Sequence, residues 1–520
     1  MDVKQLKEDV RQGRVDADRL VDLLVGLQRQ LESAERQRES ARQELHAAKQ
    51  RIDELEKQLG GGAPAPTTKV DEPFSLRAEE KRQQKKKKRR KGSKKGRRGR
   101  LRTADKVKLA ERTEPVFPEG VPPQACQLSH TRPVWRLEQG RAVLVAYDIY
   151  RGPRNQYGTI PGVLGRSEFG LEIVIEIAYL VYVMGLSFDK VCALLQFLQQ
   201  LRLSKTQADR LLRQLSRHWQ QEFEVLCTLL ANSLVVHADE TSWSIKSVWA
   251  FLSEKARLLF FGVPKDADTL KAILDPETFA GLLISDDAAV YANFSQAQKC
   301  WAHLLRKAIK LTLQDPENQE YRQFTDRLLA VYRQACRVQR DQRLSDAGRA
   351  RKVAALDDAL LELCVALWLA ELPPLEEGPE NDYRLLVNEV MRLMLAQQLF
   401  TFVTAQQAQQ PNGVSKPVAG TNNEAERTLR GPAQARQTGR TNKTPVGARR
   451  QTIIVSVLES LRLYLPTFTL PRVVAEIKRW WQAGQSCFTK LLKKLHLALP
   501  APGTEEAPSI LDKVLPIPDG

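Results

Sequence analysis

The sequence predicts an α/β fold, and three observations lead to that prediction. Residues 234–241, Leu-Val-Val-His-Ala-Asp-Glu-Thr, have the length and apolar character of a buried strand that ends on carboxylates. Residues 248–252 and 258–263 follow as two more short runs of aromatic and branched residues. Segments with helical spacing lie on both sides, over 167–230 and 315–410. Strands and long helices in one chain place it in the α/β class.

Composition narrows the possible partners. A chain of 520 residues has room for two or three domains, and its formal net charge of +18 favours a polyanionic partner. No signal peptide and no apolar run long enough to cross a bilayer are found, so we expect no membrane partner. The seven cysteines form no Cys-x-x-Cys pair, which argues against a disulfide scaffold or a standard zinc module. We expect a reducing, cytoplasmic compartment.

The first sixty residues carry the pattern of a coiled coil. Apolar residues recur at alternating steps of four and three, at Leu20, Leu24, Leu27, Leu31, Ala34, Ala41, Leu45, Ala48, Ile52, Leu55 and Leu59. Only Arg38 interrupts this heptad seam, and Gly60 to Gly62 end the helix. We expect residues 1–60 to form a coiled coil through which the chain makes a homo-oligomer, with the number of strands left open.

A basic tract follows the predicted coiled coil. Between Lys81 and Arg102 there are fifteen Lys and Arg and no acid. Such a run cannot bury apolar surface and predicts a disordered linker over 61–115. The favoured function is phosphate contact through counterion release, with these candidate DNA-binding residues: Lys85, Lys86, Lys87, Lys88, Arg89 and Arg90. A solvated linker and a localisation signal are the alternatives.

The next two segments contain weaker signals. Residues 116–165 are rich in Pro, Gly and Arg, with short β-prone runs such as 142–147. Cys126 and His130 have Cys-x-x-x-His spacing, but one pair cannot complete a tetrahedral zinc site, so a structural role is favoured. The helical segment 166–230 has candidate helix starts at 186–189 and 203–206. Two such helices could read DNA as a helix-turn-helix, although most helix pairs only pack.

The strands predict where two carboxylates meet. A helix over 268–280 and an apolar strand over 282–285 complete the order β-β-β-α-β, which is the first half of an RNase H-like fold. In that topology the fourth strand lies beside the first, which brings Asp239 and Asp286 together. Adjacent carboxylates repel, and two divalent cations would relieve the repulsion. Hard oxygen ligands favour Mg²⁺ or Mn²⁺ over zinc.

A third carboxylate is expected on a later helix. Residues 421–430, Thr-Asn-Asn-Glu-Ala-Glu-Arg-Thr-Leu-Arg, follow a loop that contains Pro and Gly. Thr421 and Glu424 have the spacing of a capping box, which would give Glu424 a structural role. Glu426 has no such local role, so we prefer it as the metal ligand.

Four short motifs resemble a known family. They are His237-Ala238-Asp239-Glu240-Thr241, Ser285-Asp286 with Tyr291, Cys300-Trp301-Ala302-His303, and Asn422-Asn423 with Ala425-Glu426-Arg427. Their order and spacing resemble the DDE transposases of the IS66 family, most firmly over 166–465. The resemblance implies an RNase H-like core with a helical insertion. It also implies that the catalytic and metal-binding triad is Asp239, Asp286 and Glu426, and that the partner is DNA.

The chain departs from the family pattern at two places. The family commonly has a Cys-rich, zinc-finger-like module after the basic segment, where this chain keeps only Cys126 and His130. Zinc is therefore not expected as a cofactor. The family usually has Gly after its second Asp, whereas this chain has Asp287, which leaves the ligand choice open.

Further side chains are candidates for roles around the triad. Active-site support is expected from His237, Cys300, His303 and Asp287, with packing favoured over metal binding for Cys300 and His303. Contact with the DNA backbone is expected from Arg427, Arg430, Arg436 and Arg440. Arg449 and Arg450 extend the same basic stretch.

The domain boundaries follow from these segments. We expect a coiled coil over 1–60, a basic linker over 61–115, a small region over 116–165, helices over 166–230, the first half of the core over 231–310, a helical insertion over 311–412, the second half over 413–499 and a disordered tail over 500–520.

The leading functional hypothesis is a DNA transposase that hydrolyses a phosphodiester at the ends of an insertion sequence and joins the freed 3′-hydroxyl to target DNA. Two divalent cations would serve both steps. The alternative is a catalytically silent DNA-binding accessory protein of a mobile element. An RNA-binding coiled-coil scaffold would leave the carboxylate pattern unexplained. Accessory proteins of the element are possible further partners.

Overall fold

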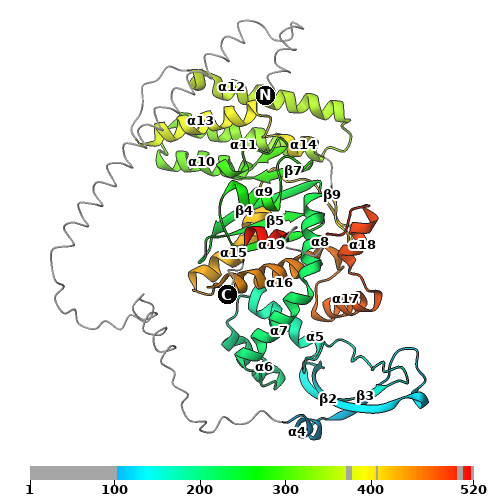
Figure 1. Ribbon diagram of the computed structural model, residues 1–520. Coiled ribbons are helices and arrows are strands. Elements are labelled where there is room, and N and C mark those ends of the chain that lie inside the picture. The colour runs from blue at the N-terminus through cyan, green and yellow to red at the C-terminus, as the bar shows by residue number, and fades with distance from the viewer. Residues whose placement is uncertain (1–101, 370–376, 406–407, 501–507, 517–520) are drawn as a thin grey trace, which may run out of the picture. The chain divides into compact units, whose positions relative to one another are not determined.

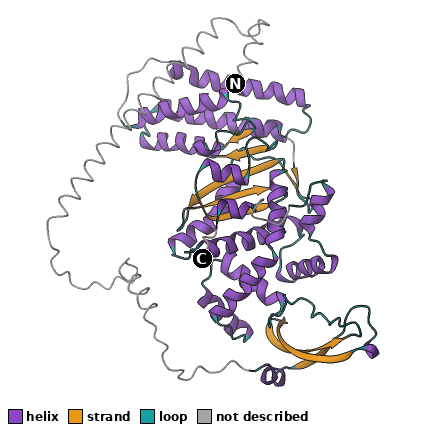
Figure 2. Cartoon of the chain, viewed as in Figure 1, coloured by secondary structure: helices purple, strands orange, loops and turns teal. Residues whose placement is uncertain are grey.

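The computed structural model describes residues 102–369, 377–405, 408–500 and 508–516, and it confirms the predicted α/β class (Figures 1 and 2). The predicted coiled coil, and the basic tract up to Leu101, lie outside the described residues. Within the described part of the chain, no helix has both the length and the apolar character needed to cross a bilayer.

A five-stranded sheet forms around the predicted carboxylate-ending strand. Its strands, in spatial order, are β6 Arg257–Val263, β5 Ser247–Ser253, β4 Val235–Ser242, β7 Leu282–Ser285 and β8 Ala297–Lys299. β4, β5 and β6 form an antiparallel meander, whereas β4, β7 and β8 are parallel neighbours. The adjacency of β4 and β7, which the strand order predicted, places the C-terminal end of β7 beside the middle of β4, which continues to Ser242.

The helix between β6 and β7 is shorter than predicted. We expected it over 268–280, but α9 spans Ala267–Ile273, with the Asp266 side chain capping its first turn. Leu274 already has an extended backbone, with φ −143° and ψ 97°. The reason is local, because Asp275 precedes Pro276 and a residue before proline avoids the helical region.

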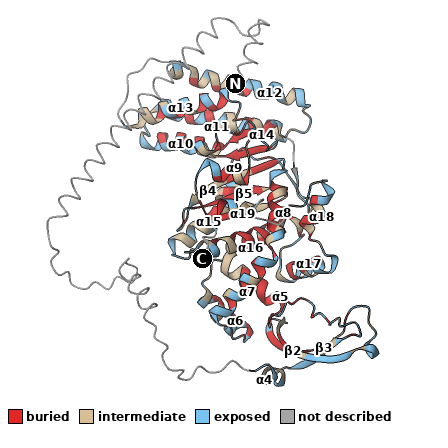
Figure 3. Cartoon of the chain, viewed as in Figure 1, coloured by how far each residue is buried: buried red, intermediate tan, exposed pale blue. Residues whose placement is uncertain are grey.

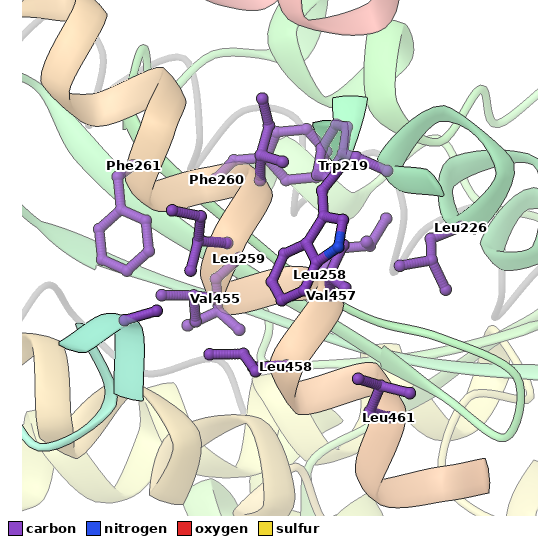
Figure 4. Close-up of a cluster of buried hydrophobic side chains, with 14 of the residues drawn as sticks. Trp219, Leu226, Leu258, Leu259, Phe260, Phe261, Val455, Val457, Leu458 and Leu461 are labelled. Atoms are coloured by element: carbon purple, nitrogen blue, oxygen red, sulfur yellow. The ribbon is translucent and has the colours of Figure 1, made fainter. Parts of the chain in front are cut away.

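The two faces of β4 enter different hydrophobic cores. Val236 and Ala238 join one core, together with α8 Gln220–Ala231 and α16 Pro445–Tyr464. Figure 4 shows part of it, where Leu258 and Phe260 of β6 lie among Trp219, Leu226 and Leu458. Val235 faces the opposite way into a second core of helices that follow β8. The alternation predicted along this strand is therefore observed.

The second core is built from helices between β8 and the segment that carries Glu426. These are α10 Trp301–Gln314, α11 Gln319–Arg340, α12 Asp346–Leu369, α13 Pro379–Leu395 and α14 Thr401–Thr404. α11 and α13 bury one side and expose the other (Figure 3). Two short antiparallel strands, β9 Ala408–Gln409 and β10 Ser415–Lys416, then lead to α15 Asn423–Gln437. The helical segments lie where the sequence predicted an insertion.

Helix α16 covers the edge strand β6 through a ladder of hydroxyl groups. The backbone N–H groups of Arg257, Leu259 and Phe261 donate to side chains of α16 at 2.9, 3.0 and 3.0 Å. The acceptors are Ser460, Ser456 and Thr452, all fully buried and spaced four residues apart. β6 pairs with β5 on one side only. On its other side the hydroxyls of α16 accept the hydrogen bonds that a further strand would otherwise accept.

The segment before the core is more regular than expected. Instead of short β-prone runs, a three-stranded sheet contains β1 Arg112–Val116, β2 Gln127–Glu138 and β3 Arg141–Arg151. Gln139 and Gly140 form the β2–β3 turn with φ of 49° and 81°, the left-handed conformation that a two-residue hairpin turn requires. Short helical segments flank these strands, α4 Thr103–Lys108 and η1 Pro123–Ala125.

Cys126 and His130 lie at the start of this hairpin. His130 is exposed on β2, where Nδ1 contacts the neighbouring Ser129 hydroxyl at 3.1 Å. The Cys126 thiol donates to the carbonyl oxygen of Pro122 at 3.5 Å. Both contacts are local.

The segment predicted to be helical before the core contains α5 Leu171–Ala178, the π-helical η2 Tyr179–Val183, α6 Phe188–Gln199, α7 Lys205–His218 and α8. Ser204 caps α7 in a capping box with Gln207, as its position suggested. Arg210 and Arg217 are exposed on α7, while Leu211 and Leu215 are buried in the core. α6 and α7 are therefore a packed pair whose outer side carries basic residues.

The end of the chain differs from the prediction of a disordered tail. After α17 Leu470–Ala483 and α18 Cys487–Lys494, the short helix α19 Ile510–Val514 buries Leu511, Val514 and Leu515 in the first core. Ser509 and Asp512 form a capping box, and Asp512 pairs with Arg449. The Pro-rich composition concealed a short segment in which three apolar residues are buried.

Candidate functional site

Two carboxylates come from neighbouring parallel strands: Asp239 lies within β4, three residues before its end, and Asp286 directly follows β7. Val235 lies opposite Leu282 and His237 lies opposite Ile284. Continuing this register by two residues places Asp239 beside Asp286. Each carboxylate accepts a local backbone N–H, from Glu240 to Asp239 at 3.0 Å and from Ala288 to Asp286 at 3.1 Å. The sheet therefore holds two acidic side chains at one edge, as the order of the strands predicted.

The electrostatics of Asp239 reflect crowding of negative charge. Burial, then the nearby charges of Glu240 and Asp286, raise the pKa of Asp239 from 3.8 to about 7. Glu426 contributes in the same direction. Desolvation and like charges both disfavour the ionised form. A cation bound among these groups would remove that penalty.

Glu240 is a buried carboxylate that sequence reasoning did not single out. Its side chain is 2% exposed and forms an ion pair with Lys265 at 2.6 Å. The Tyr291 hydroxyl, which is fully buried, donates to the same carboxylate. Glu240 is thus compensated by two fixed partners, whereas Asp239 has no cationic partner among the described residues.

The start of α15 is fixed by contacts with β4 and with the Cys-Trp-Ala-His motif. The Asn422 side chain donates to the carbonyl oxygen of Ala238 at 2.8 Å. The Asn422 backbone N–H donates to Sγ of Cys300 at 3.1 Å, and the Trp301 N–H donates to the Gly420 carbonyl oxygen at 3.0 Å. Two of the motifs recognised in the sequence therefore contact each other and set where α15 begins.

The predicted capping box at this helix is wrong. Asn422, not Thr421, is the N-cap residue, and no side chain caps the first turn of α15. The Asn422 side chain is already used by Ala238. Glu424 instead forms an ion pair with Arg257 at the start of β6. Its role is still structural, but the partner is a distant residue that local spacing cannot reveal.

Glu426 lies among polar groups of α10. Oε1 of Glu426 accepts from Arg306 at 2.7 Å and lies 3.7 Å from Nδ1 of His303. Three possible metal-ligand atoms, one each from Cys300, His303 and Glu426, lie within 4.8 Å of one another. Burial raises the pKa of the Cys300 thiol, which disfavours the thiolate that a metal would need. The contact between Cys300 and Asn422 agrees with the packing role that we favoured.

Two further predicted residues have partners of their own. Asp287 forms an ion pair with Arg392 of α13, so it points to a different partner from Asp286. His237 shares the face of β4 with Asp239, and desolvation lowers its pKa, which keeps the imidazole neutral near pH 7.

The predicted DNA-contacting arginines divide into two groups. Arg427, Arg430 and Arg440 are exposed, and Arg436 is half-buried, where it donates to the Ser242 carbonyl oxygen at 2.8 Å. Arg449 and Arg450, which the sequence placed in the same basic stretch, are only 11% exposed. They pair with Asp512 and Asp209 and therefore have structural roles.

Sequence reasoning also missed Lys299 and Arg306. Lys299 is 3% exposed, and its Nζ donates to the Asp286 carbonyl oxygen at 3.0 Å and to the Ser285 hydroxyl at 3.2 Å. Arg306 lies one helical turn after His303 on α10. The only available signal was the position of both residues within a few residues of the Cys-Trp-Ala-His motif.

Comparison with known proteins gives the family. The model of the Transposase IS66 family matches residues 166–450, which is 285 of the 520 residues. This chain belongs to the IS66 transposase family. A search of the curated proteins found no match.

Membership of the IS66 family indicates a protein of DNA transposition and implies DNA as the partner. The matched range begins before α5 and ends within α16, so it includes β4, β7 and α15. It therefore contains all three carboxylates of the predicted triad.

Proposed function

We propose that this protein is an active DDE transposase and that Asp239, Asp286 and Glu426 are its catalytic carboxylates. The observation that carries the proposal is the adjacency of the parallel strands β4 and β7. It places Asp239, which lies within β4, beside the end of β7, where Asp286 follows, with α15 packed against β4. Glu426 lies in the first turn of α15, and its charge contributes to the raised pKa of Asp239.

The sheet supports an RNase H-like core. An antiparallel meander of three strands, a helix, and two strands parallel to the first give the spatial order β6-β5-β4-β7-β8. This is the arrangement expected from the sequence order β-β-β-α-β. The helices between β8 and α15 would then be an insertion that separates the second carboxylate from the third.

The donor set fits magnesium or manganese. Three carboxylates supply hard oxygen ligands, and Asp239 is crowded by negative charge without a cationic partner among the described residues. Two divalent cations, bound to Asp239, Asp286 and Glu426, would supply Lewis-acid activation of the attacking oxygen and stabilisation of the leaving oxygen.

Residues of the chain position these groups for both displacements at phosphorus. The Ala288 N–H and the strand register orient Asp286, and Arg306 orients Glu426. In hydrolysis, water would attack the phosphodiester in line and the 3′-oxygen would leave as a hydroxyl. In strand transfer, that hydroxyl would attack a target phosphodiester. No covalent intermediate with the protein is required.

A plasmid nicking assay tests the proposal. The substrate carries the inverted repeats found in the DNA that flanks the coding sequence, and cleavage is measured with Mg²⁺, with Mn²⁺ and with EDTA. We expect metal-dependent nicks in the wild type and none in Asp239→Asn, Asp286→Asn or Glu426→Gln. DNA binding should persist in all three, because each change removes a charge with little change in shape.

The outcome also decides between the two leading hypotheses. Full activity in one variant removes that residue from the triad. DNA binding without metal-dependent nicking in the wild type would instead support the catalytically silent accessory protein.

A further inference from the structure

A large cavity lies beside the candidate catalytic site and has no role in the proposed chemistry. It measures about 810 Å³ and is lined by residues of η2, α15 and α16 and by Trp243, which follows β4 directly. Cavities of this size accommodate small organic ligands. The side chains that line the cavity indicate which class of ligand fits it.

The inner wall is aromatic and apolar. Trp243 is 6% exposed and packs edge-on against Phe261, with ring centroids 5.2 Å apart. Phe188 lines the same cavity, and so does Tyr182, whose ring and hydroxyl already contact Arg450. The indole N–H of Trp243 is buried and has no hydrogen-bond acceptor among the described residues. A wall of this kind suits a flat, aromatic ligand.

The rim is basic. The exposed side chains of Arg427 and Arg440 each donate to a neutral carbonyl oxygen, that of Asn423 and that of Gly185 respectively, both at 3.0 Å. Neither has a carboxylate partner among the described residues. Arg450 also lines the cavity, but Asp209 neutralises it. The acidic lining residue Glu459 is paired with Arg462 at 3.0 Å. The exposed part of the cavity lining therefore carries two guanidinium groups that have no carboxylate partner among the described residues.

The cavity is adjacent to the carboxylates but separate from them. Its lining includes Arg427 and Gly431 of α15 but none of the three carboxylates, and Glu426 of the same helix contacts Arg306 of α10 instead. Trp243, the residue after β4, is four residues beyond Asp239 in the chain, a separation of at most about 14 Å. That distance corresponds to about four base steps of duplex DNA.

We propose that this cavity receives one unpaired base of the DNA substrate, close to the phosphodiester that is cleaved. The base stacks against the aromatic wall, and the adjoining phosphates contact Arg427 and Arg440. Stacking of a base on aromatic side chains together with phosphate contact by arginine is the chemistry of single-strand binding. The identification of the ligand as substrate DNA rests on the proposed function, and the rest of the inference does not.

The test uses the full-length protein, with EDTA present so that binding is measured without cleavage. One probe is a blunt duplex, and the other is the same duplex with a four-nucleotide single-stranded tail that contains 2-aminopurine. Gly431→Leu places a bulky side chain at the lining of the cavity, where a Cβ at Gly431 meets no atom within 4 Å. Gly431→Ala is the matched control, which changes the same position but leaves the cavity open.

We expect the wild type and Gly431→Ala to bind the tailed duplex about tenfold more tightly than the blunt one, a factor within the range for one stacked base. Gly431→Leu should remove this preference and leave affinity for the blunt duplex unchanged. The 2-aminopurine fluorescence should report a stacked base in the wild type and in Gly431→Ala, which prefer the tailed duplex. It should report an unstacked base in Gly431→Leu, which has lost the preference.

Three results with the two duplexes would overturn the proposal. These are no preference in the wild type, an undiminished preference in Gly431→Leu, and an equal loss of both affinities in that variant. Tight binding of free 2-aminopurine deoxyribonucleoside monophosphate without a tail preference would also overturn it, because the cavity would then be a site for free nucleotides. Failure of the nicking assay is a separate result, since binding is measured here without metal.

Discussion

Asp239 is buried and surrounded by other carboxylates, and it has no cationic partner among the described residues. Its pKa is raised to about 7, chiefly by burial and by the charges of Glu240 and Asp286, whereas in the unfolded chain it ionises near 3.8. Between these two values the folded protein binds more protons than the unfolded chain. Stability of the metal-free protein is therefore lost as pH rises from about 4 to about 7.

Asp239→Asn should remove this loss. Without metal, we expect the variant to be about 1–3 kcal/mol more stable than the wild type at pH 8 and equal to it near pH 4. Urea unfolding across that pH range, in EDTA, measures the difference. Millimolar Mg²⁺ should stabilise the wild type more than the variant. A difference that does not change with pH would contradict the crowding of charge that we describe.

Glu424 and Glu426 are two residues apart and have different partners. Arg257 pairs with Glu424, and Arg306 pairs with Glu426. We expect Glu424→Gln to lower the free energy of unfolding by about 0.5–1 kcal/mol, since Glu424 is partly exposed, and to retain metal-dependent nicking. Glu426→Gln should abolish nicking. Loss of nicking in Glu424→Gln at full stability would reverse our choice between them.

At the residue scale, the sequence predicted the acidic residues but not what surrounds them. Asp239, Asp286 and Glu426 were predicted from the strand pattern and from motif order, although Asp239 lies within β4 and not at its end. Glu240, Lys299 and Arg306 could not be predicted, because their partners are 51, 14 and 120 residues away and leave no local pattern. The preference for Glu426 over Glu424 rested on a capping box that does not form.

At the scale of elements, the hydroxyl ladder between α16 and β6 is the contact most open to a direct test. The Ser456 hydroxyl accepts from the Leu259 N–H at 3.0 Å, and both groups are buried. Ser456→Ala would leave that N–H without a partner, which should cost about 1–3 kcal/mol. Urea unfolding measures the loss, and Ser415→Ala, at an exposed position, should change stability by less than about 0.5 kcal/mol. Equal effects would show that the ladder does not hold the edge strand.

The elements that the sequence predicted well are those whose pattern is local and strong. The strand over 282–285 was placed at its observed bounds, because four apolar residues lie between turn signals. α9 was drawn too long, since the break at Asp275-Pro276 was not given enough weight. The hairpin of β2 and β3 was missed as a unit, because Pro133 and polar residues on its exposed side conceal the alternation.

At the scale of the whole molecule, the tract from Lys81 to Arg102 accounts for most of the net charge of +18. Deleting it should weaken binding to specific and to random duplexes alike, because counterion release from phosphate does not depend on sequence. The slope of log affinity against log salt should become shallower in the deletion. An unchanged slope would show that the tract only connects its neighbours.

Joining two ends of an element to one target requires two active sites to be held together, and the heptad from Leu20 to Leu59 predicts how. Its seam is mostly Leu and Ala, and Arg38 near the middle would cost stability while fixing the register and number of strands. We predict that the segment 1–60 alone is helical and self-associates, and that Leu27→Asp combined with Leu31→Asp abolishes this. Circular dichroism and analytical ultracentrifugation at tens of micromolar measure both properties.

The same double substitution in the full-length protein separates assembly from chemistry. In the proposed mechanism each active site would contain its own three carboxylates, so cleavage at a single end should be nearly unchanged. Joining of paired ends should fall by at least about tenfold, because the second site must now be found by diffusion instead of being held nearby. A matched change outside the seam, Glu32→Asp with Gln28→Asp, should affect neither reaction. A monomeric 1–60 segment, or equal losses of cleavage and joining, would show that another part of the chain brings the two sites together.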